Sequence, residues 1–163
     1  MSETSKTHKA HAPKTLKFAI FVCSTSRYMA IQRGEQKTDV SGDLIESLLE
    51  KAGHQVLFRR VVSDDKVMIE HALKSVLNNE GVDAAIFCGG TGVTHSDVTM
   101  ETVLPFMEKT LPGFGEFFRR LSFDKVGSGA VMSRAVAGVA GGKALFCIPG
   151  SPDAVRISVE LLI

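Results

Sequence analysis

The 163-residue chain is 44% hydrophobic and 23% charged, a composition typical of a soluble globular protein. Its 19 basic and 18 acidic side chains leave a net charge near +1, so no general electrostatic field attracts nucleic acid or an anionic membrane. No apolar run approaches the ~20 residues that cross a bilayer, and we therefore expect neither nucleic acid nor a membrane as a partner. Any anion-binding site has to be local.

The composition divides the chain into a tail and a domain. Residues 1–15 are rich in Ser, Thr, Lys and His and lack the apolar core of a signal peptide, which predicts a disordered tail. Residues 16–163 have the length of a single domain with its own core. His8 and His11 could together bind a metal, but two histidines without further ligands make a poor metal site, so a plain tail is favoured.

The three cysteines are an odd number without CxxC spacing, which fits a reducing cytoplasm better than a disulfide scaffold. Each of Cys23, Cys88 and Cys147 ends an apolar run. We therefore expect small buried hydrophobic side chains rather than reactive thiols, in a cytoplasmic protein.

Strands and helices alternate in the first half of the domain. Apolar runs predict three strands, at residues 16–23, 55–62 and 83–88. The polar segment 24–38 predicts a loop followed by irregular chain. Apolar residues at helical spacing then predict a helix capped by Asp39 or Ser41 and closed by Gly53, and a second helix that starts at residues 63–65. This order implies right-handed crossovers and a three-layer, doubly wound α/β fold with a mostly parallel sheet.

The second half predicts three more helices and two more strands. Helices are expected at residues 98–109, at 115–122 and from Pro152 to the end of the chain. Residues 111–113 predict a turn. The strands are expected at 133–138, as an edge strand, and at 144–148. The closely spaced phenylalanines at positions 114, 117 and 118 indicate core or a subunit contact rather than a stacking site.

A glycine turn after the third predicted strand is the first candidate site. Its residues Gly89, Gly90, Thr91 and Gly92 allow positive φ and let backbone N–H groups converge on an anion, although a tight turn without a ligand is the simpler alternative. A second loop, with Gly150 and Ser151, follows a later strand and opens a helix. A third loop, at Ser24, follows the first strand. In an open parallel sheet all three lie at strand carboxyl ends, where ligands bind, which favours a phosphate-binding site.

Five motifs follow one another along the chain: GGTG at 89–92, DVT at 97–99 with Glu101, PGFGEFFRRLSF at 112–123, SRAVAG at 133–138 and PGSP at 149–152. In this combination the chain resembles the molybdenum-cofactor biosynthesis protein B family, which is close to the molybdopterin adenylyltransferases and to the G domain of gephyrin. The resemblance covers residues 18–163. It implies the α/β molybdopterin-binding domain fold, assembled as homo-oligomers that are trimers or hexamers.

The reaction implied by this resemblance is the transfer of AMP from ATP to the terminal phosphate of molybdopterin, with Mg²⁺, giving adenylyl-molybdopterin and pyrophosphate. Adenylyl transfer needs two anionic groups held in line, so donors must neutralise both and a metal must bridge the ATP phosphates. Other proteins of molybdenum cofactor biosynthesis are further candidate partners.

The resemblance also assigns side chains. Asp39 and Asp97 match two acidic positions on which activity in the family depends, and Ser133 matches a serine that contacts the pterin. Asp97 is the candidate Mg²⁺ ligand, directly or through water. Taken without the family, Asp39 is more simply a helix cap, and Asp43 is its rival for the acidic role. Arg134 is either a phosphate contact or a charge at the edge of the sheet.

Two alternatives belong to other functional classes. One is a non-catalytic molybdopterin-binding or scaffold protein that keeps the fold and the phosphate loops, against which the presence of both Asp39 and Asp97 favours an enzyme. The other is a nucleotide pyrophosphatase or amidase of the competence-damage family, which shares GGTG and the acidic loop but usually belongs to a longer chain. A Rossmann dehydrogenase is disfavoured because no GxGxxG follows the first strand.

Overall fold

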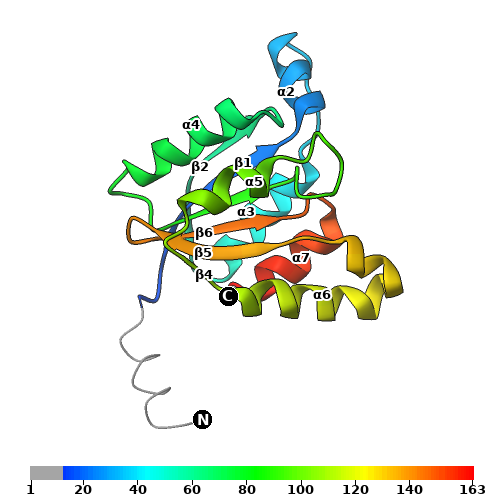
Figure 1. Cartoon of the computed structure of the whole chain (residues 1–163). Coiled ribbons are helices and arrows are strands. Elements are labelled where there is room, and N and C mark those ends of the chain that lie inside the picture. The colour runs from blue at the N-terminus through cyan, green and yellow to red at the C-terminus, as the bar shows by residue number, and fades with distance from the viewer. Residues whose placement is uncertain (1–12) are drawn as a thin grey trace.

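The computed structural model describes residues 13–163, so His8, His11 and most of the predicted tail lie outside the described residues. One six-stranded sheet forms the centre of the molecule, in the order β2-β1-β3-β6-β5-β4 (Figure 1). Its strands are β1 (Lys17–Cys23), β2 (Gln55–Val62), β3 (Ala84–Cys88), β4 (Lys109–Thr110), β5 (Val136–Ala140) and β6 (Lys143–Ile148). Strands β2, β1, β3 and β6 are parallel, whereas β5 and β4 are antiparallel to their neighbours. The predicted, mostly parallel sheet is confirmed.

Helices cover both faces of this sheet (Figure 1). One face carries α4 (Lys66–Leu77) and α5 (Thr99–Val103), and the other carries α3 (Val40–Lys51), α6 (Pro112–Val126) and α7 (Pro152–Glu160). The side chains of β1 alternate between the two layers, because successive residues of a strand point to opposite faces. Phe21 packs in the layer of α4, and Ile20 packs in the layer of α3 and α7. The predicted three-layer, doubly wound arrangement is therefore confirmed.

The buried neighbouring strands β1 and β3 show how loops that are far apart in the sequence meet at one end of the sheet. All five residues of β3 and the last six of β1 are buried, as the apolar runs predict. Phe21 and Phe87 are register partners, and their rings stack with centroids 5.1 Å apart. Because β1, β3 and β6 are parallel, their carboxyl ends lie at the same end of the sheet. The loops that follow Cys23, Cys88 and Ile148 therefore emerge there together.

The loop and irregular chain predicted for residues 24–38 are partly wrong, because this segment contains α2 (Thr25–Gln32). The side chain of Ser24 caps the helix by accepting a hydrogen bond from the backbone N–H of Arg27 at 3.4 Å. Ala30 is the only buried residue of α2, so the helix has almost no apolar stripe from which it could be recognised. Figure 1 shows α2 projecting beyond the carboxyl end of β1.

The helix predicted for residues 98–109 is also wrong in its length. After α5 the chain forms a short 3₁₀ turn, Leu104–Phe106, and then the strand β4. Pro105 has no backbone N–H for a helical hydrogen bond, which accounts for the early end. Because β4 pairs with β5, the edge strand of the sheet is β4. The strand β5, which we expected at the edge, is the second strand from that edge.

Two further helix ends differ from the prediction. Pro112 is the first residue of α6 rather than part of a turn, in a position where a proline needs no hydrogen-bond donor. Helix α7 ends at Glu160 instead of continuing to Ile163. Among the described residues, no helix has the length and apolar character required to span a bilayer.

Candidate functional site

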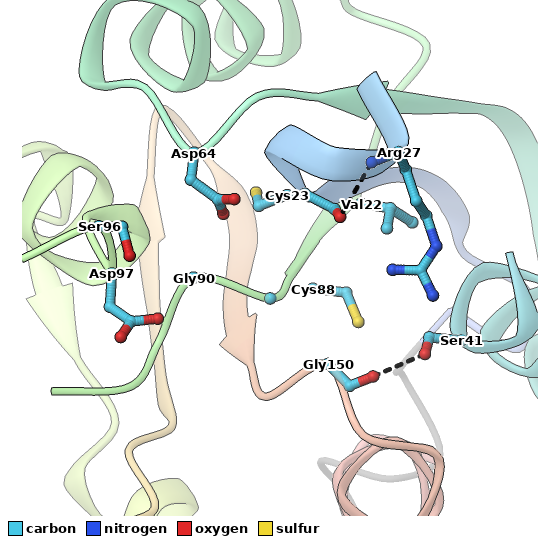
Figure 2. A pocket seen from close by; sticks show the side chains of 12 residues that line it. Val22, Cys23, Arg27, Ser41, Asp64, Cys88, Gly90, Ser96, Asp97 and Gly150 are labelled. Atoms are coloured by element: carbon cyan, nitrogen blue, oxygen red, sulfur yellow. Dashed lines mark hydrogen bonds between the residues drawn. The ribbon is translucent and has the colours of Figure 1, made fainter. Parts of the chain in front are cut away.

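A cavity of about 150 Å³ lies at the carboxyl ends of the central strands (Figure 2). The loops after β1, β3 and β6 all contribute to it, as do the start of α3 and the turn after β2. Its lining residues are Val22, Cys23, Ser24, Arg27, Ser41, Asp64, Cys88, Gly89, Gly90, Ser96, Asp97 and Gly150. Of the residues predicted for the site, Gly89, Gly90, Asp97 and Gly150 therefore meet at one cavity.

Glycine is needed at the first two positions of the loop after β3. Gly89 has φ of +105°, and a Cβ there would lie 2.4 Å from the carbonyl oxygen of Cys23. Gly90 has φ of +61°, and a Cβ there would lie 2.8 Å from Oδ1 of Asp64. The backbone therefore approaches both β1 and the turn after β2 so closely that no side chain fits. This close approach forms the floor of the cavity.

Arg134 secures the other half of the same loop. Its Nε donates to the carbonyl oxygen of Thr91 at 2.9 Å, and a terminal nitrogen donates to the carbonyl oxygen of Gly92. Its second terminal nitrogen donates to Glu101 at 2.6 Å, and this hydrogen bond lowers the pKa of the Glu101 carboxyl. Arg134 does not line the cavity. Arg134 thus clamps the glycine loop from outside the cavity.

Asp97 borders the cavity and closes the loop into a turn. Its Oδ2 accepts hydrogen bonds from the backbone N–H of Thr94 at 2.9 Å and from the Thr94 hydroxyl at 2.6 Å. The Thr94 hydroxyl, followed by the backbone N–H groups of Thr94 and Gly92, holds the pKa of Asp97 below its usual value of 3.8 against the opposing effect of burial. Asp97 is therefore a carboxylate at neutral pH and carries a full negative charge at the cavity.

A second carboxylate, Asp64, lines the cavity and was missed among the site residues predicted from the sequence. Its Oδ2 accepts hydrogen bonds from the backbone N–H of Thr25 at 2.8 Å and from the Thr25 hydroxyl at 3.0 Å. Figure 2 shows Asp64 and Asp97 on the same side of the cavity, near Gly90. Its sequence neighbourhood resembles an ordinary helix start, but its place directly after a parallel strand was a signal that could have identified it.

Asp39 lies behind the cavity rather than in its lining. Its Oδ1 accepts a hydrogen bond from the backbone N–H of Gly42 at 3.1 Å, so Asp39 does cap α3. The same Oδ1 is 3.9 Å from Nε of Arg27, and its Oδ2 is 3.7 Å from Nε of Arg59. Asp43, its rival in the sequence, is largely exposed and pairs with Arg59 at 2.7 Å, outside the cavity.

Two predicted residues, Ser133 and Ser151, line a separate hollow of about 60 Å³ beside α6 and α7. Ser151 caps α7, because its hydroxyl accepts a hydrogen bond from the backbone N–H of Ala154 at 3.3 Å. The preceding residue, Gly150, faces the main cavity, where its carbonyl oxygen accepts a hydrogen bond from the Ser41 hydroxyl at 2.6 Å. The PGSP loop thus separates the two spaces.

The three cysteines are free and buried, as the sequence predicted. Burial raises the pKa of both Cys23 and Cys88, the two that line the cavity, to about 12, and it raises the pKa of Cys147 well above its ordinary value. All three are neutral thiols at physiological pH, which makes them poor nucleophiles and poor metal ligands.

Carboxylate oxygen is the metal-binding chemistry that this cavity offers. Within residues 13–163, no group of three or more His, Cys, Asp or Glu side chains is arranged to hold a metal ion. The two carboxylates of Asp64 and Asp97 are an incomplete set for a metal held by protein alone. They fit Mg²⁺, which commonly binds through one or two carboxylates and completes its octahedron with water and substrate phosphates.

Comparisons with known proteins agree with this geometry. The chain matches the family described as "Probable molybdopterin binding domain" over residues 19–163. It is 42% identical over 157 residues to molybdenum cofactor biosynthesis protein B of Halalkalibacterium halodurans, across 96% of this chain and 88% of that protein. It is 38% identical over 159 residues to a molybdopterin adenylyltransferase of Pyrococcus furiosus, across 95% of this chain and 89% of that protein. The crystal structure of the tungsten cofactor synthesizing protein MoaB from Pyrococcus furiosus is 36% identical and matches with a TM-score of 0.81, across 93% of this chain and 92% of that one.

Proposed function

Because the chain belongs to the molybdopterin-binding domain family, we propose that it transfers AMP from ATP to the terminal phosphate of molybdopterin in molybdenum cofactor biosynthesis. Relatives that carry the names molybdenum cofactor biosynthesis protein B and molybdopterin adenylyltransferase align over at least 95% of the chain, which supports this proposal. The observation that carries it is the cavity in which the glycine loop meets the ionised Asp97.

The chemistry of this transfer requires no nucleophilic side chain from the protein. An oxygen of the pterin phosphate forms a bond to the α-phosphorus of ATP, and the bond between that phosphorus and the bridging oxygen to the β-phosphorus breaks. The electron pair leaves with pyrophosphate. Phosphate monoesters are already mostly ionised at neutral pH, so no general base is required. The protein has to hold two anions in line and offset their charge.

Backbone donors of the glycine loop suit one of these tasks. The N–H of Gly89 is already bonded to the carbonyl oxygen of Ile148 at 2.9 Å, and that of Gly92 faces Asp97. Among the described residues, the N–H groups of Gly90 and Thr91 donate to no other residue. We propose that these two N–H groups bind a substrate phosphate. Arg134 then assists phosphate binding through the loop, by fixing the carbonyl groups of Thr91 and Gly92.

Asp97, together with Asp64 on the same side of the cavity, is the proposed site for Mg²⁺. When bound, the ion would neutralise and orient the ATP phosphates. The hydrogen bonds from Thr94 hold the Asp97 carboxylate in place, and those from Thr25 do the same for Asp64. Asp39 contributes from behind the residues that line the cavity. Ser133, Gly150 and Ser151 remain proposed contacts of the pterin or its phosphate around the PGSP loop.

The setting of this activity is likewise proposed. We infer a cytoplasmic enzyme that forms trimers or hexamers and works beside other proteins of molybdenum cofactor biosynthesis. The exposed apolar side chains of α6 and of the 3₁₀ helix that follows it, Gly127–Met132, include Phe117, Phe123 and Met132 and support contact between subunits. The non-catalytic alternative, a molybdopterin-binding or scaffold protein, uses the same cavity without turnover.

The deciding experiment is an adenylyl transfer assay with purified protein, molybdopterin, labelled ATP and Mg²⁺, in which adenylylated pterin and pyrophosphate are followed. We expect turnover in the wild type and its loss in Asp97→Ala. The control is Glu80→Gln, an exposed carboxylate distant from the cavity, which should leave turnover unchanged. Tight pterin binding without turnover in the wild type would instead support the scaffold.

A further inference from the structure

We propose that Arg27 is the anion-binding side chain of the cavity, and that Asp39 is a positioning residue that acts through it. The inference rests on the proposed function, because it assigns a site for a phosphate group of one of the two substrates. Neither role follows from the sequence, in which residues 24–38 gave no sign of a helix.

The first observation is the charge of the cavity. Its lining contains two carboxylates, Asp64 and Asp97, and among its described residues Arg27 is the only lysine or arginine. Figure 2 shows the carboxylates near Gly90, whereas the guanidinium of Arg27 extends towards Ser41 and Cys88 on the other side. The cavity thus has an acidic side, suited to a cation, and one basic group. Two polyanionic substrates entering an acidic cavity require such a cation.

The second observation is that the hydrogen-bonding capacity of Arg27 is largely unused. Its backbone is fixed in the first turn of α2, and its Nε donates to the carbonyl oxygen of Thr38 at 3.3 Å. Among the described residues, neither of its two terminal nitrogens makes a hydrogen bond, and 28% of the side chain is exposed. A guanidinium held at Nε with both terminal nitrogens available can grip two oxygens of one phosphate.

The third observation concerns Asp39, which is shielded from the cavity. Only 11% of its side chain is exposed, and its carboxylate lies between Arg27 and Arg59. Its Oδ2 is buried and has no hydrogen-bond partner among the described residues. The distance of 3.9 Å to Nε of Arg27 is too long for a hydrogen bond but short enough for charge attraction. Asp39 therefore orients the Nε side of Arg27 and leaves the terminal nitrogens for substrate.

The test measures binding of anions without turnover. Inorganic pyrophosphate, ATP and molybdopterin are titrated separately, at fixed Mg²⁺, into the full-length wild type and into Arg27→Gln, Arg27→Lys and Asp39→Asn, by calorimetry. Arg33→Gln is the matched control, since Arg33 follows α2, is exposed and pairs with Glu35 away from the cavity lining. Thermal melting establishes that each variant folds.

We expect Arg27→Gln to lower the affinity for at least one probe by about tenfold or more, because a charge-assisted hydrogen bond is lost. Arg27→Lys should lose less, since it keeps the charge without the planar fork. Weaker binding of pyrophosphate and ATP would show that Arg27 contacts a phosphate of ATP. Weaker binding of molybdopterin alone would show that it contacts the phosphate of the pterin. Unchanged binding of all three probes by folded Arg27→Gln, or no binding of any probe by the wild type, would overturn the proposal.

The role of Asp39 is tested by combining the two substitutions. Asp39→Asn retains an oxygen that can cap α3 but removes the charge, so its own effect on binding should be smaller than that of Arg27→Gln. If Asp39 acts through Arg27, adding Asp39→Asn to Arg27→Gln changes binding no further. An undiminished effect of Asp39→Asn in the double variant would contradict the positioning role. These outcomes do not depend on AMP transfer, so a protein that binds but does not turn over would refute the proposed function alone.

Discussion

Arg134 and Thr91 are 43 residues apart in the chain, yet the Nε of one donates to the carbonyl oxygen of the other at 2.9 Å. We expect Arg134→Gln to lower the free energy of unfolding by about 1–3 kcal/mol, because it leaves loop carbonyl groups without their charged donor. Urea denaturation measures this loss. Arg120→Gln, on an exposed part of α6, is the control. Equal midpoints for the two variants would show that the clamp adds no stability.

The backbone of Gly89 provides a second prediction. Gly89→Ala combines a strained positive φ with a Cβ only 2.4 Å from a carbonyl oxygen of β1. Gly34→Ala has a similarly positive φ of +74° but nothing within 4 Å of its Cβ. We expect Gly34→Ala to cost about 1 kcal/mol from strain and Gly89→Ala clearly more, measured by thermal melting. Equal losses would mean that the loop can move away from β1 without cost.

The ionisation of Asp97 predicts how stability depends on pH. Its pKa is lowered in the folded protein, so the stabilisation that it contributes is present above pH 3.8 and is lost as the pH falls further, through the folded pKa. Asp97→Asn removes this dependence. The difference in urea midpoint between pH 7 and pH 3 should therefore be smaller in Asp97→Asn than in the wild type. A difference of the same size in both proteins would be evidence against the hydrogen bonds from Thr94.

The thiols predict a chemical behaviour. Because burial raises the pKa of Cys23 and Cys88 to about 12, both are protonated at pH 8 and enclosed. A thiol reagent such as iodoacetamide should label neither residue in the folded protein within the time in which it labels all three cysteines in urea. Mass spectrometry of digested protein identifies the modified positions. Rapid labelling of Cys88 in the native state would indicate that the cavity opens more widely than its 150 Å³ suggests.

The parts of the fold that could be predicted from the sequence are those in which burial leaves a periodic pattern. The strands β1 and β3 are nearly continuous apolar runs because both of their faces are covered. Helix α2 leaves no such pattern, since it buries only Ala30. The segment from residue 98 to 109 has enough apolar residues for a longer helix, but Pro105 ends it.

The sequence was sufficient to predict those residues of the candidate cavity that belong to one local motif. It was not sufficient for residues that reach the cavity from other parts of the chain. The glycine loop and Asp97 are neighbours in sequence, so a local motif was sufficient to identify them. Asp64 and Arg27 reach the cavity only because parallel strands end side by side, and in the sequence each simply stands near the start of a helix. The place of Arg134 depends on a contact across more than forty residues, which no local pattern specifies.

The clamp on the glycine loop has a consequence for how fast and how tightly ligands bind. Since Arg134 and Asp97 hold the loop from two sides, its conformational entropy is lost when the chain folds and not when a ligand arrives. A phosphate that meets the loop finds donors already in place, so little of its interaction energy is spent on ordering the protein. Association is then limited by diffusion and charge, and differences in affinity among ligands arise from how quickly each one dissociates.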